Sequence, residues 1–89
     1  MMMHPIFMKV NKKGKALAIK LSEECGELVQ QLCKYANEYG DREKIEHEMG
    51  DVLGLCTMLM DELHLDKKNL ESFTEKRIKK TKEALQKLD

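Results

Sequence analysis

Residues 17–32, LAIKLSEECGELVQQL, repeat apolar side chains at the spacing of an α-helix and set carboxylates among them. Leucines at positions 17, 21, 28 and 32 form one apolar stripe. Glu24 falls on that stripe, where another leucine would be expected. Glu24 and Glu27 are spaced i, i+3, so they share one face of the helix. The stretch predicts an amphipathic helix with acids on its packing side.

A second stretch, residues 45–59, repeats this arrangement. Its apolar stripe consists of Ile45, Val52, Leu55 and Leu59. Glu48 interrupts the stripe, and Asp51 follows it at the same i, i+3 spacing. Two helices packed by these stripes would bring four acids together in a partly buried place. Because buried anions are unfavourable unless they are paired or bound to a metal, a hard divalent cation is expected between them.

Three main helices are expected. The first runs from about Lys15 to Glu38 and stops at Tyr39–Gly40. Asp41 should cap the second, which continues to about Leu63, and Asp66 should cap the third. The third helix has an apolar side made of Leu70, Phe73, Leu85 and Leu88. β-branched residues are scarce and nowhere alternate, so no strand is predicted.

The domain organisation follows from these helices. Residues 1–14 are expected to form an N-terminal lead-in with a turn-like break at Asn11–Gly14, and residues 15–89 one helical domain. The second helix carries a further apolar stripe, formed by Met49, Leu53, Cys56 and Met60. Three helices cannot cover both of its stripes. The predicted fold class is therefore all-α, a small domain of three main helices assembling into a dimeric or tetrameric four-helix-type bundle.

Charge is balanced over the 89 residues, with 16 basic and 16 acidic side chains, but it is unevenly placed. Residues 22–62 are acidic and residues 67–87 are basic. This pattern would suit binding of a metal–polyphosphate complex; alternatively, the acidic and basic segments pack against each other and neutralise their charges. A uniformly basic surface is absent, so no nucleic-acid partner is expected. Three cysteines without CxxC spacing indicate a reduced, cytoplasmic chain, and the opening residues are too short to span a membrane.

The kinds of side chain in the two acidic stretches restrict which metals could bind there. Clustered carboxylates favour Mg²⁺ or Mn²⁺ over Zn²⁺. A di-iron bundle would require Glu-x-x-His pairs, and no Glu in the sequence precedes a His by three. His47-Glu48 resembles the start of a zincin motif, but Asp51 stands where its second His belongs. His47 and His64 are interpreted as surface or cap residues. The alternative for all the acids is a solvated helix face.

Glu23-Glu24-Cys25-Gly26-Glu27 followed by Glu48-Met49-Gly50-Asp51 resembles the EExxE…ExxD signature of the MazG-like all-α nucleoside triphosphate pyrophosphohydrolases. The resemblance covers about residues 15–85. It implies Mg²⁺, with Mn²⁺ as a substitute, and hydrolysis of an NTP or dNTP to the monophosphate and pyrophosphate by a metal-activated water. The metal ligands it implies are Glu24, Glu27, Glu48 and Asp51. Glu23 would orient or deprotonate the water, or help to hold a further metal.

The resemblance also implies substrate contacts. The family often has a Lys and, four residues on, an Asn in its last helix; Lys76 fits the first position, whereas Lys80 replaces the Asn. Lys34 and Tyr35 are candidates for the base pocket, with ordinary helix surface as the alternative. The implied partners are a nucleoside triphosphate and further copies of the chain. From a different class, a catalytically idle helical dimeric regulatory or interaction module is the competing hypothesis.

Overall fold

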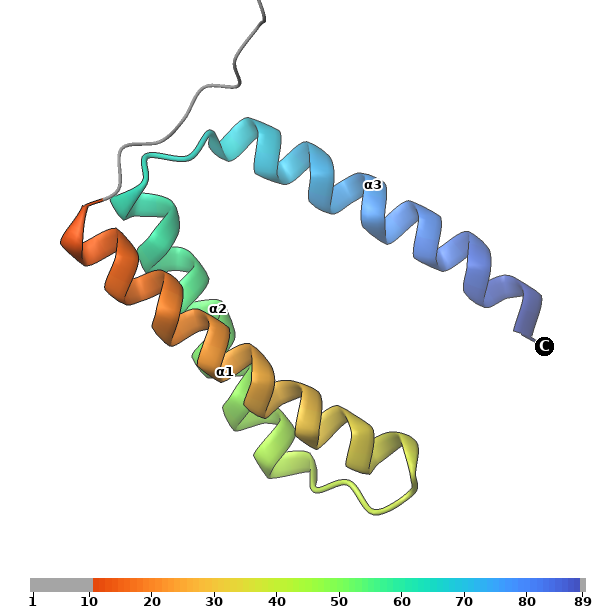
Figure 1. Ribbon diagram of the computed structural model, residues 1–89. Helices are drawn as coiled ribbons and strands as arrows, with labels where there is room; N and C mark the ends of the chain where they lie inside the picture. The colour runs from red at the N-terminus through yellow and green to blue at the C-terminus, as the bar shows by residue number, and fades with distance from the viewer. Residues whose placement is uncertain (1–10, 89) are drawn as a thin grey trace, which may run out of the picture.

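The computed structural model describes residues 11–88, which form three α-helices and a terminal 3₁₀ turn (Figure 1). The elements are α1 (Lys12–Ala36), α2 (Arg42–Glu62), α3 (Lys67–Leu85) and η1 (Gln86–Leu88). No strand occurs in this described part, so the predicted all-helical class is confirmed. The predicted caps are confirmed as well, since Asp41 and Asp66 accept backbone N–H groups of the first turns of α2 and α3.

The start of α1 differs from the prediction. The turn-like break expected at Asn11–Gly14 is wrong, because the side chain of Asn11 caps a helix that already begins at Lys12. Its Oδ1 accepts from the N–H of Gly14 at 2.6 Å. A Cβ at Gly14 would lie 3.2 Å from Cδ2 of Leu63. Glycine therefore lets the first turn of α1 approach the end of α2 closely.

The end of α1 also differs in detail. The reversing residue is Glu38, whose φ of 71° is left-handed, and the N–H groups of Glu38 and Tyr39 bond back to carbonyls of the last turn. This is a Schellman closure without glycine. Gly40 is needed for another reason, since a Cβ there would lie 2.7 Å from Cα of Tyr35. α2 closes in the same way, with His64 at φ 52°.

α1 and α2 form an antiparallel hairpin, joined by residues 37–41 (Figure 1). The predicted stripes face each other in it: Leu17, Leu21 and Leu28 of α1 are half-buried, and so are the four apolar residues of the first α2 stripe. Leu32 lies at the edge, where 40% of it is exposed. α3 diverges from the hairpin and packs against neither helix over residues 11–88.

This arrangement leaves a large apolar surface exposed. No hydrophobic side chain is buried among the described residues, and Leu53 of the second α2 stripe is 68% exposed. The accessible area is 8276 Å², whereas a compact monomer of this mass exposes about 5,400 Å². The radius of gyration is 16.6 Å, against about 12 Å for a compact domain of this length. Within residues 11–88 no helix has the length and apolar character needed to cross a membrane.

Candidate metal centre

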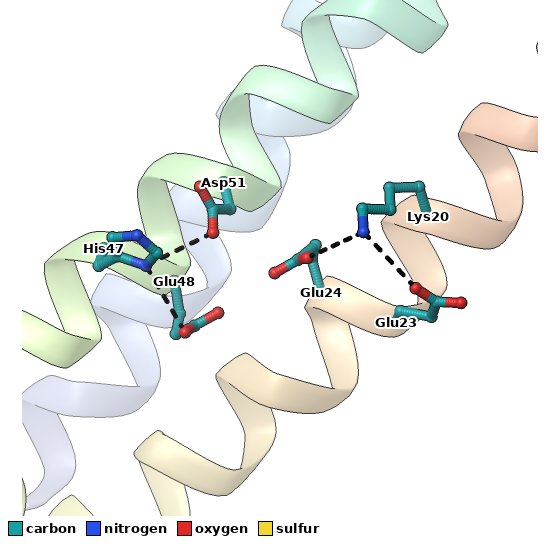
Figure 2. Close-up of polar contacts among 6 residues, drawn as sticks. All are labelled: Lys20, Glu23, Glu24, His47, Glu48 and Asp51. Atoms are coloured by element: carbon teal, nitrogen blue, oxygen red, sulfur yellow. Dashed lines mark ion pairs between the residues drawn. The ribbon is translucent and has the colours of Figure 1, made fainter.

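The packing of α1 on α2 carries two carboxylates into the interface between the helices. Glu24 lies midway along α1 and Glu48 a third of the way along α2, each at a position that the apolar stripe would give to a hydrophobic residue. Figure 2 shows the two side chains on the facing sides of the helices. Only 13% of the Glu24 side chain and 16% of the Glu48 side chain are exposed.

Two groups of possible metal ligands meet at this point. Glu24, Glu27 and Glu48 form one group and His47, Glu48 and Asp51 the other; in each, one ligand atom per residue lies within 4.8 Å of the others. Glu48 belongs to both groups and joins them. The structure thus brings together the four acids that the sequence singled out. They come from two helices, so the site depends on the hairpin.

Two buried carboxylate oxygens in this cluster have no hydrogen-bond partner in the described part of the chain, which bears on whether a cation fits here. Oε2 of Glu24 and Oε2 of Glu48 are buried and have no hydrogen-bond partner among residues 11–88. Ionised carboxylates can only accept, so neither can satisfy the other. Buried polar atoms without partners are rare in native proteins and call for a ligand or an ion. An all-oxygen donor set with unsatisfied lone pairs suits a hard divalent cation such as Mg²⁺ or Mn²⁺.

The crowding of acids in the cluster raises the pKa of Glu24. Its pKa is raised from 4.5 to about 6. The largest cause is a hydrogen bond with Glu27, which requires a proton between the two carboxyl groups; burial and repulsion from Glu27, Asp51 and Glu48 raise the pKa further. Without a cation, the cluster therefore holds this proton at pH values below about 6.

Two contacts with the acids, and one further buried polar atom on α1, were not anticipated from the sequence. The Nζ of Lys20 lies 3.9 Å from a carboxylate oxygen of Glu24 and 3.9 Å from one of Glu23. The Nδ1 of His47 contacts the carboxylates of Glu48 and Asp51. Gln31 has a buried Oε1 without a partner among residues 11–88. The sequence did contain a hint of each: Lys20 precedes Glu24 by four residues, His47 precedes Asp51 by four, and Gln31 follows Glu24 by seven.

The other predicted residues of the hairpin lie outside the two ligand groups. The Glu23 side chain is 60% exposed and points to the Lys20 side of α1 (Figure 2). Lys34 and Tyr35 are exposed on the last turn of α1. Tyr35 lines a hollow of about 300 Å³ together with Arg42 and Ile45 of α2. This hollow is at the far end of the hairpin from Lys12.

Lys76 and Lys80 lie on α3 and are not brought to the acids within one chain, because α3 packs against neither helix of the hairpin over the described residues. Both lysines line an open hollow of about 630 Å³ along α3, shared with Phe73 and Arg77. The i, i+4 spacing places them on one side of the helix, as the sequence predicted. Their distance from the hairpin means that a phosphate role for them depends on assembly.

Fold and site together define a small all-helical protein with a carboxylate cluster on a helical hairpin. Residues 12–85 match the family described as MazG nucleotide pyrophosphohydrolase domain, and the chain belongs to that family. The match spans α1, α2 and α3 in full and confirms the resemblance inferred from the two acidic motifs. No curated protein and no solved structure matches the chain.

Proposed function

We propose that this protein hydrolyses nucleoside or deoxynucleoside triphosphates to the monophosphate and pyrophosphate in the presence of Mg²⁺, for which Mn²⁺ can substitute. The observation that carries the proposal is the pair of inward-facing carboxylates, Glu24 and Glu48, whose buried oxygens have no partner among residues 11–88. Family membership supplies the reaction class. Triphosphates reach proteins as complexes with Mg²⁺, so an acidic centre suits such a substrate.

In this proposal Glu24, Glu27, Glu48 and Asp51 hold the metal. The bound ion supplies positive charge to the phosphate oxygens and lowers the pKa of the attacking water. Glu23 orients that water or accepts its proton; its exposed carboxylate beside Glu24 leaves it accessible to solvent. The hairpin contributes rigidity, because a site on packed helices holds its geometry better than one on loops.

We also propose that the protein works as a homodimer or homotetramer in which helices of several subunits share one bundle. The support is the exposed apolar surface, which includes Met49 and Leu53 on α2 and Ile19 and Val29 on α1. Exposed patches of this kind mark association surfaces. The acidic hairpin and the basic α3 are also complementary in charge.

Assembly would supply the cations that a triphosphate needs. The acids repel a triphosphate, so positive charge must approach from elsewhere, and residues 67–87 carry the largest group of basic side chains. We assign Lys76 and Lys80 to the phosphates on this ground, with α3 of one subunit reaching the hairpin of another. Lys34 and Tyr35 are assigned to the base, since the hollow beside Tyr35 opens between α1 and α2.

The test is a hydrolysis screen of the eight common NTPs and dNTPs with pyrophosphate as the readout. Glu48→Gln and Asp51→Asn should abolish hydrolysis while leaving far-UV circular dichroism unchanged. Glu43→Gln is the matched control, because it removes one carboxylate from an exposed position of the same helix that lies outside both ligand groups and outside the hollow beside Tyr35. If no nucleotide is hydrolysed with Mg²⁺ or Mn²⁺, the competing hypothesis of an idle helical module is the better account.

A further inference from the structure

His47 lies against the acids of α2 but is absent from the acidic motifs of the family resemblance. Its Nδ1 is 3.5 Å from Oδ2 of Asp51 and 3.6 Å from Oε1 of Glu48 (Figure 2). The three ligand atoms of this group lie within 4.8 Å of one another. His47 and Asp51 are spaced i, i+4, the spacing by which two side chains on one helix face can chelate a metal.

The three side chains differ in how firmly they are placed. Glu48 is fixed, since only 16% of its side chain is exposed, and its buried Oε2 has no partner within residues 11–88. Asp51 is 40% exposed and His47 is 71% exposed. The imidazole therefore has room to turn its ring toward a cation held by the two carboxylates, at little cost in packing.

Adding a nitrogen ligand changes the relative affinity of the centre for Mg²⁺ and Mn²⁺. Mg²⁺ is bound by oxygen ligands and water, whereas imidazole is a ligand of first-row transition metals. Mn²⁺ takes the same carboxylate and water ligands as Mg²⁺. As a first-row transition ion it also binds imidazole nitrogen, so one histidine beside several carboxylates raises the affinity for Mn²⁺ relative to Mg²⁺.

We infer that His47 is a nitrogen ligand of the metal held by Glu48 and Asp51, and that it raises the affinity of the centre for Mn²⁺ relative to Mg²⁺. The inference rests on the proposed function only in requiring a metal at these acids. Substitution of His47 lowers the affinity for Mn²⁺ relative to Mg²⁺ and leaves the carboxylate ligands in place. His47 thereby acts as a specificity determinant for the cofactor.

The test uses the full-length chain loaded with one equivalent of Mn²⁺ and examined by electron spin echo envelope modulation, which detects ¹⁴N bonded to the ion. The wild type should show ¹⁴N modulation, and His47→Gln should lose it. His64→Asn is the matched control: it removes an exposed histidine, and asparagine tolerates the left-handed backbone at that position. In calorimetric titrations, His47→Gln should weaken Mn²⁺ binding by about tenfold or more, as loss of a group holding a metal site commonly does. Mg²⁺ binding should change less than about twofold, because the oxygen ligands remain.

The possible results separate this inference from the proposed function. Bound Mn²⁺ that shows no ¹⁴N modulation, or modulation that persists in His47→Gln, overturns the role of His47 and leaves the carboxylate centre standing. Mn²⁺ binding that Glu48→Gln does not weaken overturns the centre itself, and the inference with it. Loss of ¹⁴N modulation in His47→Gln alone, with Mn²⁺ affinity falling and Mg²⁺ affinity kept, supports it.

Discussion

Lowering the pH from 7 to 5 should weaken Mg²⁺ binding by about tenfold through Glu24 alone. The metal requires the ionised carboxylate, and the pKa of Glu24 is raised to about 6 by Glu27, by burial and by the neighbouring acids. A metal ion must therefore displace a proton below that pH. Binding should weaken as the solution becomes more acidic, since the protonated carboxyl group no longer offers its charge.

The size of the effect follows from the ionised fraction of Glu24. With a pKa of about 6, roughly 9% of the side chain is ionised at pH 5 and roughly 91% at pH 7. If the pKa stayed at 4.5, the ionised fraction would change by only about 1.3-fold over the same range. The two cases differ enough for a single titration series to distinguish them.

The assay is calorimetric titration of Mg²⁺ at pH 5, 6 and 7 in two buffers of different ionisation enthalpy. At pH 6 about half a proton should be released for each ion bound. Glu46→Gln, an exposed carboxylate on α2, should keep the full pH dependence. An affinity that changes less than twofold between pH 5 and 7, with no proton released at pH 6, would refute the reasoning about Glu24.

Further outcomes are expected on stability, assembly and phosphate binding. Without metal, the free energy of unfolding should fall as the pH rises from 4.5 to about 6, because native Glu24 holds its proton over this window and the unfolded chain does not; Glu24→Gln should flatten that slope in urea denaturation. Glu38→Gly should stabilise the fold by about 1 kcal/mol in the same assay, since φ is 71° there; a loss of stability would contradict the left-handed closure. Leu53→Lys should reduce the mass found by light scattering at micromolar concentration, because Leu53 is 68% exposed in the single chain; a wild-type chain that is already monomeric would remove the case for a shared bundle. Lys76→Ala or Lys80→Ala should lower kcat/KM by about tenfold or more with Tm nearly unchanged, as loss of a charge-assisted contact predicts; wild-type efficiency in both variants would exclude the phosphate role.

The local features of the fold were predictable because they depend on neighbouring residues. Leucine spacing predicted the packing face of α1, and the carboxylates of Asp41 and Asp66 predicted where α2 and α3 begin. The ends were less accurate. Gly40 suggested the stop of α1, but the reversing residue is Glu38, a type that rarely adopts a left-handed backbone.

The position of α3 was not predictable from its own pattern. Its apolar side includes Phe73, which is 64% exposed in the single chain, so the pattern shows that a surface needs cover without showing what covers it. Whether Lys76 and Lys80 reach the acids therefore stays a prediction.

Glu24 and Glu48 were predictable as a pair because each breaks an apolar stripe, and Glu27 and Asp51 follow them at the i, i+3 spacing. The contacts of Lys20 and His47 were not predicted, because both side chains are largely exposed and their direction depends on the rotamer. The spacing along the helix allows these contacts but does not determine which of them form. The metal roles of the four acids stay predictions that the proposed variants will test.

All the carboxylates of the candidate centre lie on one hairpin whose connection spans residues 37–41. A short connection favours rapid folding, since little chain entropy is lost before the two helices meet. Encounters between subunits are slower and depend on concentration. We therefore expect a newly made chain to gather its acids before it finds a partner. Metal loading can then precede association, so the order of assembly is set by the connectivity of the chain.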